Sequence, residues 1–278
     1  MKRDLFSTGE MIRQPSPGHE PAHPAGISAG LLRIFGRYSE HYVARHFHSV
    51  RLLANGAPKT CFDVPLVLYL NHSSWWDPIV CLLLARRFFP RRKSYGPIDA
   101  AALQRYAFLE RLGFFGVEHG TGRGARNFRK RAEAILRQND SALWLTPQGM
   151  FIDNRPRPLY FQSGLGRLAH GATSAAFQPL AIEYTFWEER LPEVLISFGE
   201  AVIFEQPRSL NVPDATDLFE AALASVQDQL SAASQRRQRE EWRVLVEGGA
   251  GTTRVYDWWR RAHATLRRQK FHSAHSEL

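Results

Sequence analysis

The stretch that decides the fold is residues 66–78, which read Leu-Val-Leu-Tyr-Leu-Asn-His-Ser-Ser-Trp-Trp-Asp-Pro. Its first five residues form an uninterrupted apolar run, typical of a strand buried on both faces of a sheet. The run ends at Asn71 and His72, and Pro78 lies where the first turn of a helix is expected, running to about Ala85. A buried strand that leads through a polar turn into a helix is a building unit of α/β domains.

Outward from this unit, short apolar runs and helical patterns alternate along the chain. We expect further strands at residues 114–118, 142–145, 179–186 and 193–204. We expect helices at residues 28–50, 100–112, 125–137, 165–173, 215–240 and 254–270. This order predicts an α/β fold with a single domain, residues 28–210, whose mixed, largely parallel sheet is flanked by helices. We expect a disordered N-terminal tail at residues 1–27 and a C-terminal helical extension at residues 211–278.

Composition limits the classes of protein to be considered. The 278 residues are 44% hydrophobic, which excludes a mainly disordered or fibrous chain. The formal net charge of +9 favours an anionic partner, such as a membrane surface, a nucleic acid or an acidic substrate. Nucleic acid is the least favoured, because the basic residues are spread along the whole chain and no recognised nucleic-acid-binding motif is present. The two cysteines, Cys61 and Cys81, provide neither a disulfide framework nor zinc-ligand spacing, and we expect no metal.

The sequence also bears on location. Residues 1–26 lack the apolar core of a secretory signal, and no run reaches the roughly 18 apolar residues of a membrane span. The helices expected at 28–50 and 254–270 combine aromatic and aliphatic residues with arginines, a composition typical of interfacial helices. We therefore expect a cytoplasmic protein held peripherally on the anionic cytoplasmic face of a membrane. The alternative is that the apolar face of each helix packs on the core and its arginines are solvated.

His72 and Asp77 are the residues whose placement suggests chemistry. The carboxyl end of a buried strand is where open α/β sheets place their ligands, and His72 lies there. An imidazole can take a proton from a hydroxyl once a second group fixes its tautomer, and a carboxylate five residues later can do so. The alternative is structural: the spacing is short and common, and His72 could simply cap the helix that begins near Asp77.

Four ordered segments resemble the conserved blocks of the glycerolipid acyltransferases, the lysophosphatidic-acid-acyltransferase-like superfamily. Asn71-His72 followed by Asp77 is similar to the first block. Residues 112–119 are similar to the second, whose usual form is Gly-x-x-Phe-x-x-Arg. Residues 145–151 stand where the family has Phe-Pro-Glu-Gly-Thr-Arg, and residues 178–182 are similar to the fourth block, a strand that carries a proline. The resemblance covers residues 30–205.

The resemblance implies an O-acyltransferase that moves a fatty acyl group from an acyl thioester to a hydroxyl. The donor would be acyl-CoA or an acyl-carrier protein, with no further cofactor. His72 would be the general base that deprotonates the acceptor, and Asp77 would orient and stabilise it. The favoured acceptor is a lysophospholipid, 1-acylglycerol 3-phosphate (lysophosphatidic acid), after which the family is named.

Departures from the family pattern leave the acceptor open. Where the family places the phosphate-associated Arg, Glu and Arg of blocks two and three, this chain has His119, Gln148 and Phe151. Arginines that follow these blocks could hold a phosphate instead, or could belong to solvated loops. The alternatives are a lipid hydroxyl without a phosphomonoester (a glycolipid, an ornithine lipid or a carotenoid-type acceptor) or a non-catalytic lipid-binding relative. The candidate substrate-binding residues are Asn71, Gly113, His119, Arg123, Pro147, Gln148, Gly149 and Arg155.

Overall fold

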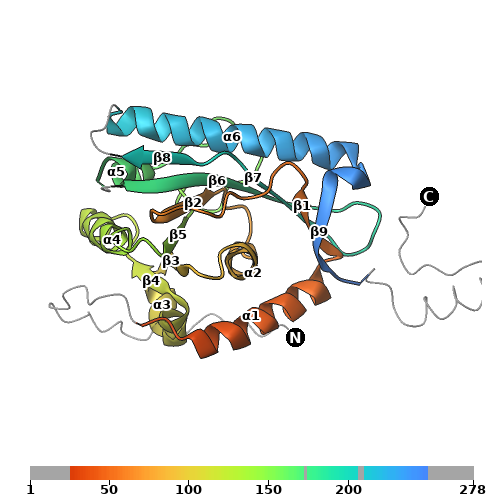
Figure 1. The fold of residues 1–278 in the computed structure, drawn as a ribbon, viewed down its shortest axis with the longest axis horizontal. Helices are drawn as coiled ribbons and strands as arrows, with labels where there is room; N and C mark the ends of the chain where they lie inside the picture. The colour runs from red at the N-terminus through yellow and green to blue at the C-terminus, as the bar shows by residue number, and fades with distance from the viewer. Residues whose placement is uncertain (1–25, 172–173, 206–209, 250–278) are drawn as a thin grey trace, which may run out of the picture.

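The computed structural model describes residues 26–171, 174–205 and 210–249, which fold around one mixed β-sheet (Figure 1). Its strands are β1 Ser49–Leu53, β2 Leu66–Leu70, β3 Lys93–Asp99, β4 Phe114–Val117, β5 Ser141–Leu145, β6 Ser174–Thr185, β7 Glu193–Phe198, β8 Val202–Glu205 and β9 Trp242–Glu247. They lie in the order β4-β3-β5-β2-β6-β7-β1-β9, and β8 also pairs with β6. The predicted α/β fold with a mixed, largely parallel sheet flanked by helices is confirmed.

The central strands run parallel, which brings their carboxyl ends to one edge of the sheet. β2 pairs in parallel with β5 and with β6, and β3 pairs in parallel with β4 and with β5. β7 and β8 run antiparallel to β6, and β9 runs antiparallel to β1. The segments that follow β2 and β5 therefore start side by side, although about 75 residues of chain separate them.

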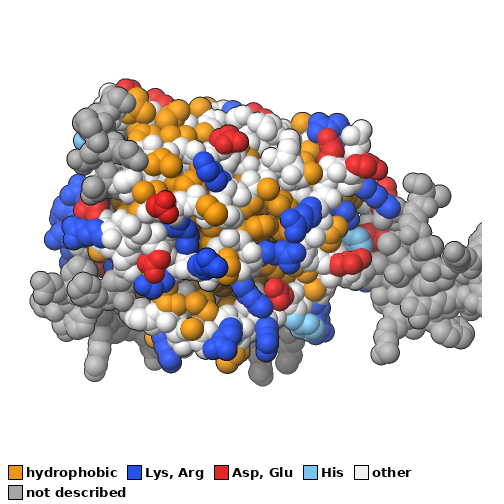
Figure 2. Space-filling model, in the orientation of Figure 1, with side chains coloured by type: hydrophobic (Ala, Val, Ile, Leu, Met, Phe, Trp, Pro, Cys, Tyr) orange, Lys and Arg blue, Asp and Glu red, His pale blue; other side chains and the backbone are white. Residues whose placement is uncertain are grey.

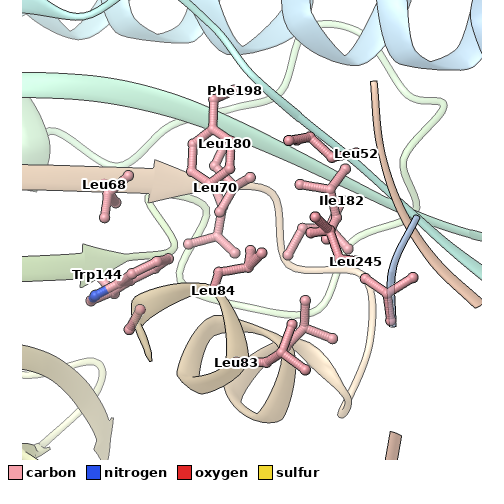
Figure 3. Close-up of a cluster of buried hydrophobic side chains, with 14 of the residues drawn as sticks. Leu52, Leu68, Leu70, Leu83, Leu84, Trp144, Leu180, Ile182, Phe198 and Leu245 are labelled. Atoms are coloured by element: carbon pink, nitrogen blue, oxygen red, sulfur yellow. The ribbon is translucent and has the colours of Figure 1, made fainter. Parts of the chain in front are cut away.

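Helices cover both faces of the sheet (Figure 1). They are α1 Ala29–His46, α2 Asp77–Phe88, α3 Ala100–Arg105, α4 Gly122–Ile135, α5 Gly164–Gly171 and α6 Val212–Arg236, with 3-10 turns at Ala107–Leu112 and Arg239–Glu241. Alternate residues of β2 point to opposite faces. Leu66, Leu68 and Leu70 belong to a core shared with α1 and α2, part of which is shown in Figure 3. Val67 and Tyr69 belong to a second core shared with α4, α5 and α6.

The helix expected at residues 28–50 is shorter than predicted. Ser28 caps its start by accepting a hydrogen bond from the backbone N–H of Leu31, and the helix ends at His46. Residues 49–53 form β1 instead, which pairs in parallel with β7. The prediction was wrong here because Phe47 and Val50 continue a helical spacing in the sequence. Strand pairing with a distant segment overrides that local pattern.

Other elements differ at their ends or were missed. The strand expected at 193–204 is two strands, β7 and β8, and the helix expected at 100–112 is α3 followed by a 3-10 turn. β1, β3 and β9 were not predicted as strands. Within the segment expected as a helical extension, α6 packs on the sheet and β9 adds a strand beside β1.

Two predicted segments fall partly or wholly outside the described residues. These are the N-terminal tail up to residue 25 and the helix expected at 254–270. At the border of the tail, Ile27 packs against the second core, and the Ser28 N–H donates to the carbonyl of Arg111. No helix among residues 26–249, as far as they are described, has the length and apolar character needed to cross a bilayer.

Candidate active site

His72 and Asp77 form a hydrogen-bonded pair where β2 ends and α2 begins. The loop between them makes one short turn, which places His72 Nδ1 2.7 Å from Asp77 Oδ2. The same carboxylate oxygen accepts a hydrogen bond from the Ser74 N–H at 3.1 Å. The Asp77 side chain is 2% exposed and that of His72 is 20% exposed. Because a carboxylate can only accept, Nδ1 carries the proton, and Nε2 is left as the proton acceptor.

Tyr184 holds the second oxygen of Asp77. Its hydroxyl donates to Asp77 Oδ1 at 2.6 Å from β6, the strand next to β2. Burial, and then the charge of Asp77, raise the pKa of the Tyr184 hydroxyl well above its usual value, so it stays protonated as a donor. Tyr184 was not predicted from the sequence. Its only signal is the alternation Leu180, Ile182, Tyr184, which places it on the same face of the sheet as α2.

Asn71 connects three segments through buried hydrogen bonds. Its side chain donates to the Ile182 carbonyl at 2.9 Å and accepts from the Ile182 N–H at 2.9 Å. It also donates to Asn154 Oδ1 at 2.7 Å, and Asn154 in turn donates to the Ile182 carbonyl at 3.1 Å. Asn71 is 1% exposed, so its amide fixes the end of β2 against β6 and against the loop that follows β5. Asn154 was not predicted.

The loop after β5 lies against His72, as the pairing of β2 with β5 requires. Gln148 is 2% exposed, and its side chain accepts from the His72 N–H at 3.4 Å and donates to the Leu159 carbonyl at 3.1 Å. The Ile152 N–H donates to the His72 carbonyl at 2.8 Å. Gly149 turns the chain between them with φ 72°, a conformation that favours glycine. The segment expected as the third block is therefore brought to the predicted base.

Phe151 packs directly on the ring of His72. The two ring centroids are 4.1 Å apart and the ring planes are inclined by 31°. Phe151 and its neighbour Met150 are each 60% exposed, so an apolar surface borders the imidazole where the resembled family has an arginine. Trp75, in the loop between His72 and Asp77, is also an exposed aromatic residue, at 65%.

His119 and Arg123 lie beyond the end of β4, which is three strands away from β2 in the sheet. At a strand spacing of about 4.8 Å, three steps amount to roughly 14 Å along the edge of the sheet. His119 is exposed, and Arg123 forms an exposed ion pair with Glu118 at 3.3 Å. The structure thus does not group these two predicted residues with the histidine.

Arg155 and Arg157, which follow the third block, both bind carboxylates. Arg155 makes two hydrogen bonds to Asp153, at 2.8 and 2.6 Å, and its side chain is 89% exposed. This pairing holds the pKa of the Asp153 carboxyl well below its usual range. Arg157 binds Asp228 of α6 at 2.5 Å and the carbonyls of Asn154 and Pro156. Either guanidinium would have to leave a carboxylate before it could bind a phosphate.

An apolar pocket of about 290 Å³, including open solvent at its mouth, begins at the first turn of α2, and neither His72 nor Asp77 lines it. Pro78 and Cys81, from the first turns of α2, line it on one side, and Tyr95, Gly113 and Phe114 line it on the other. Gly113 has φ 97°, and a side chain there would collide with the carbonyl of Ser94, so only glycine fits this turn. Burial, and then the charge of Asp77, raise the pKa of the Cys81 thiol well above its usual value. The thiol therefore stays neutral.

Comparison with known proteins adds no assignment. No protein-family model matches the chain, and no curated protein sequence matches it. Among the described residues, no three His, Cys, Asp or Glu side chains are grouped as ligands of a metal ion.

Proposed function

We propose that this protein is an O-acyltransferase that transfers a fatty acyl group from an acyl thioester to the hydroxyl of a lipid. The observation that carries the proposal is the 2.7 Å hydrogen bond from His72 to a buried Asp77 at the carboxyl end of the central strand. The bond leaves Nε2 as a base at the position where open α/β sheets bind ligands.

The reaction follows from that geometry. His72 Nε2 takes the proton of the acceptor hydroxyl while its oxygen attacks the thioester carbonyl, forming a tetrahedral intermediate. The intermediate collapses, the carbon–sulfur bond breaks, and the imidazolium returns the proton to the leaving thiolate. Asp77 stabilises the imidazolium formed between these steps, and Tyr184 and the Ser74 N–H keep the carboxylate in place. No side-chain nucleophile is needed, because the oxygen of the acceptor attacks.

The apolar pocket supports an acyl substrate. Its lining includes the residue that directly follows Asp77, and a neutral thiol and aromatic rings suit a hydrocarbon chain. The donor is acyl-CoA or an acyl-carrier protein. The resemblance to the glycerolipid acyltransferases makes a lysophospholipid, 1-acylglycerol 3-phosphate, the first acceptor to test.

A membrane surface is the proposed source of the lipid acceptor. The outer face of α1 exposes Arg33 and Arg37 beside Ile34 and Tyr38, which are 70% and 52% exposed. Basic and apolar side chains mixed on one face suit an anionic interface, where the cations meet headgroups and the apolar groups enter the boundary region. We place the protein peripherally on the cytoplasmic face of the membrane.

The test is release of free thiol from palmitoyl-CoA and from palmitoyl acyl-carrier protein, with and without lysophosphatidic acid or monoacylglycerol. We expect acceptor-dependent release that falls by roughly 10²–10⁴-fold in His72→Ala, because a positioned base contributes about that much. The control is His170→Ala, which removes an exposed histidine of α5 and should leave the rate unchanged. Equal rates in wild type and His72→Ala with both donors would contradict the proposal.

A further inference from the structure

The contact between Phe151 and His72 bears on which lipid hydroxyl is acylated. The ring of Phe151 covers one face of the imidazole, with ring centroids 4.1 Å apart, and remains 60% exposed on its other side. An acceptor hydroxyl that reaches Nε2 must therefore bring the atoms next to it against an aromatic surface. Such a surface favours apolar or neutral groups. It offers a phosphate dianion neither a positive charge nor a hydrogen bond to replace the water that the phosphate loses on binding.

The charged groups that follow Phe151 in the same loop are already paired with one another or with α6. Asp153 is two residues further on, and its pairing with Arg155 keeps the carboxyl ionised. Arg157 is bound to Asp228 and to two carbonyls. Asp77 lies behind the imidazole itself. A phosphomonoester next to the reacting hydroxyl would thus face an apolar ring, and the arginines of this loop would have to leave their carboxylates to bind it.

The start of α4 is the second segment that could supply a cation, but its Arg123 is paired with a carboxylate and lies far from His72. Figure 2 shows Lys and Arg side chains gathered at the edge of the molecule where Figure 1 places α4. Arg123 at the start of that helix pairs with Glu118, and α4 packs beside β4, three strands from β2. Arg123 is thus paired with a carboxylate and lies beyond β4, three strands along the sheet from the end of β2.

We propose that Phe151 is a specificity-determining residue, and that the acceptor is a lipid whose reacting hydroxyl has no phosphomonoester beside it. The inference rests on the proposed acyl transfer and names its substrate class. Phe151 contacts the acceptor next to the hydroxyl and selects neutral neighbours for it. The step is the one given above, with the proton passing from the neutral lipid hydroxyl to His72 Nε2 and then to the departing thiolate.

A matched pair of acceptors tests this class directly. Monoacylglycerol and lysophosphatidic acid with the same oleoyl chain differ by one phosphate, and both are offered in neutral detergent micelles with palmitoyl-CoA. We expect wild type to acylate monoacylglycerol at least about tenfold faster, the factor that corresponds to one unmade charge-assisted hydrogen bond. Faster or equal acylation of lysophosphatidic acid, or acylation of neither lipid, overturns the inference.

Substitutions in the loop after β5 test whether Phe151 is responsible for the preference between the two acceptors. In Phe151→Arg, which places a guanidinium beside His72, we expect the ratio of the two rates to move at least about tenfold toward lysophosphatidic acid. Met150→Arg is the matched control, since it adds the same charge one residue earlier at equal exposure, and it should move the ratio much less. An unchanged ratio in Phe151→Arg, or equal shifts in both variants, overturns the role of Phe151. Thioester loss that does not depend on His72 would instead refute the proposed acyl transfer.

Discussion

At the scale of single residues, His72 and Asp77 come from one short segment, but a residue far away in the sequence also holds Asp77 in place. The two residues are five positions apart, and the loop between them closes through the hydrogen bond from the Ser74 N–H to the Asp77 carboxylate. The remaining support comes from Tyr184, more than a hundred residues later in the chain. A carboxylate held by three donors loses little freedom when the imidazole becomes charged, because the dipoles that stabilise it are already in place.

Substitutions of Asp77 and Tyr184 distinguish a role in orienting His72 from a role in binding substrate. We expect Asp77→Asn to lower kcat by roughly 10²–10⁴-fold with little change in KM, because the amide no longer stabilises the imidazolium. Tyr184→Phe removes one donor and should lower kcat by about tenfold. Steady-state thiol release at saturating acceptor measures both.

The control for these variants is Tyr106→Phe, which removes a half-exposed hydroxyl at the end of α3. It should retain the wild-type kcat. A Tyr184→Phe enzyme with unchanged kcat and raised KM would show that the hydroxyl serves substrate binding and not the carboxylate.

At the scale of elements, α1 connects the candidate site to the outer surface. Trp76, directly before α2, packs against Tyr42 and Phe47, with ring centroids 5.4 and 4.8 Å apart. One side of α1 is therefore fixed to the loop that carries His72 and Asp77. The exposed ring of Tyr38 stacks on Tyr42 on this same side, with centroids 5.4 Å apart, and Arg33 and Arg37 lie further round the helix. A lipid surface that contacts Tyr38 would therefore lie close to the loop between His72 and Asp77.

Charge reversal on α1 tests that placement. We expect the double variant Arg33→Glu, Arg37→Glu to bind vesicles that contain phosphatidylglycerol at least about tenfold more weakly, since each cation near an anionic leaflet contributes about 1 kcal/mol. Binding to pure phosphatidylcholine vesicles should change little. Co-sedimentation with vesicles of the two compositions measures the effect.

Two exposed arginines elsewhere serve as the matched control, Arg167 on α5 and Arg239 after α6. Their double reversal makes the same change in net charge on elements across the sheet from α1 (Figure 1). Equal weakening in both double variants would assign the binding to overall charge and not to α1.

At the scale of the whole molecule, the sheet divides the interior into separate apolar cores. The core shared with α1 and α2 and the core shared with α4, α5 and α6 take alternate residues of the same strands. Tyr69 is 1% exposed in the second core, and burial raises the pKa of its hydroxyl well above its usual value. Tyr184 is shifted in the same direction.

These two tyrosines contribute to a fall in stability at alkaline pH, together with Tyr95 and Cys81, whose pKa values burial also raises. In the unfolded chain the two tyrosines lose their protons near pH 10, whereas in the folded protein they keep them. The folded state then binds more protons, so the free energy of unfolding is fully retained below about pH 9 and decreases as pH rises further. We expect a loss of roughly 1–2 kcal/mol from these groups between pH 8 and 10.5, measured by urea unfolding.

A Tyr69→Phe variant isolates this contribution from other alkaline effects. It removes one of the shifted groups without touching the Asp77 network, so the loss between pH 8 and 10.5 should shrink by roughly 0.5–1 kcal/mol. A variant that loses as much stability as wild type over the same pH range would contradict the assignment to buried tyrosine.

The sequence by itself determined the local features of this protein. The apolar run of β2, the helix started by Pro78, and the histidine and aspartate between them are all visible within residues 66–78. They can be predicted because hydrophobic periodicity and short polar turns depend on neighbouring residues. The class of the fold follows from the same alternation of strands and helices.

Only the tertiary structure decided which distant segments complete the site. The pairing of β2 with β5 and β6 brings Gln148 and Phe151 to the histidine and Tyr184 to its partner Asp77. The order of the sheet leaves His119 and Arg123 three strands away. It also made β1 a strand, although Phe47 and Val50 continue a helical spacing. Strand order and register depend on contacts between segments far apart in the chain, which no local pattern encodes.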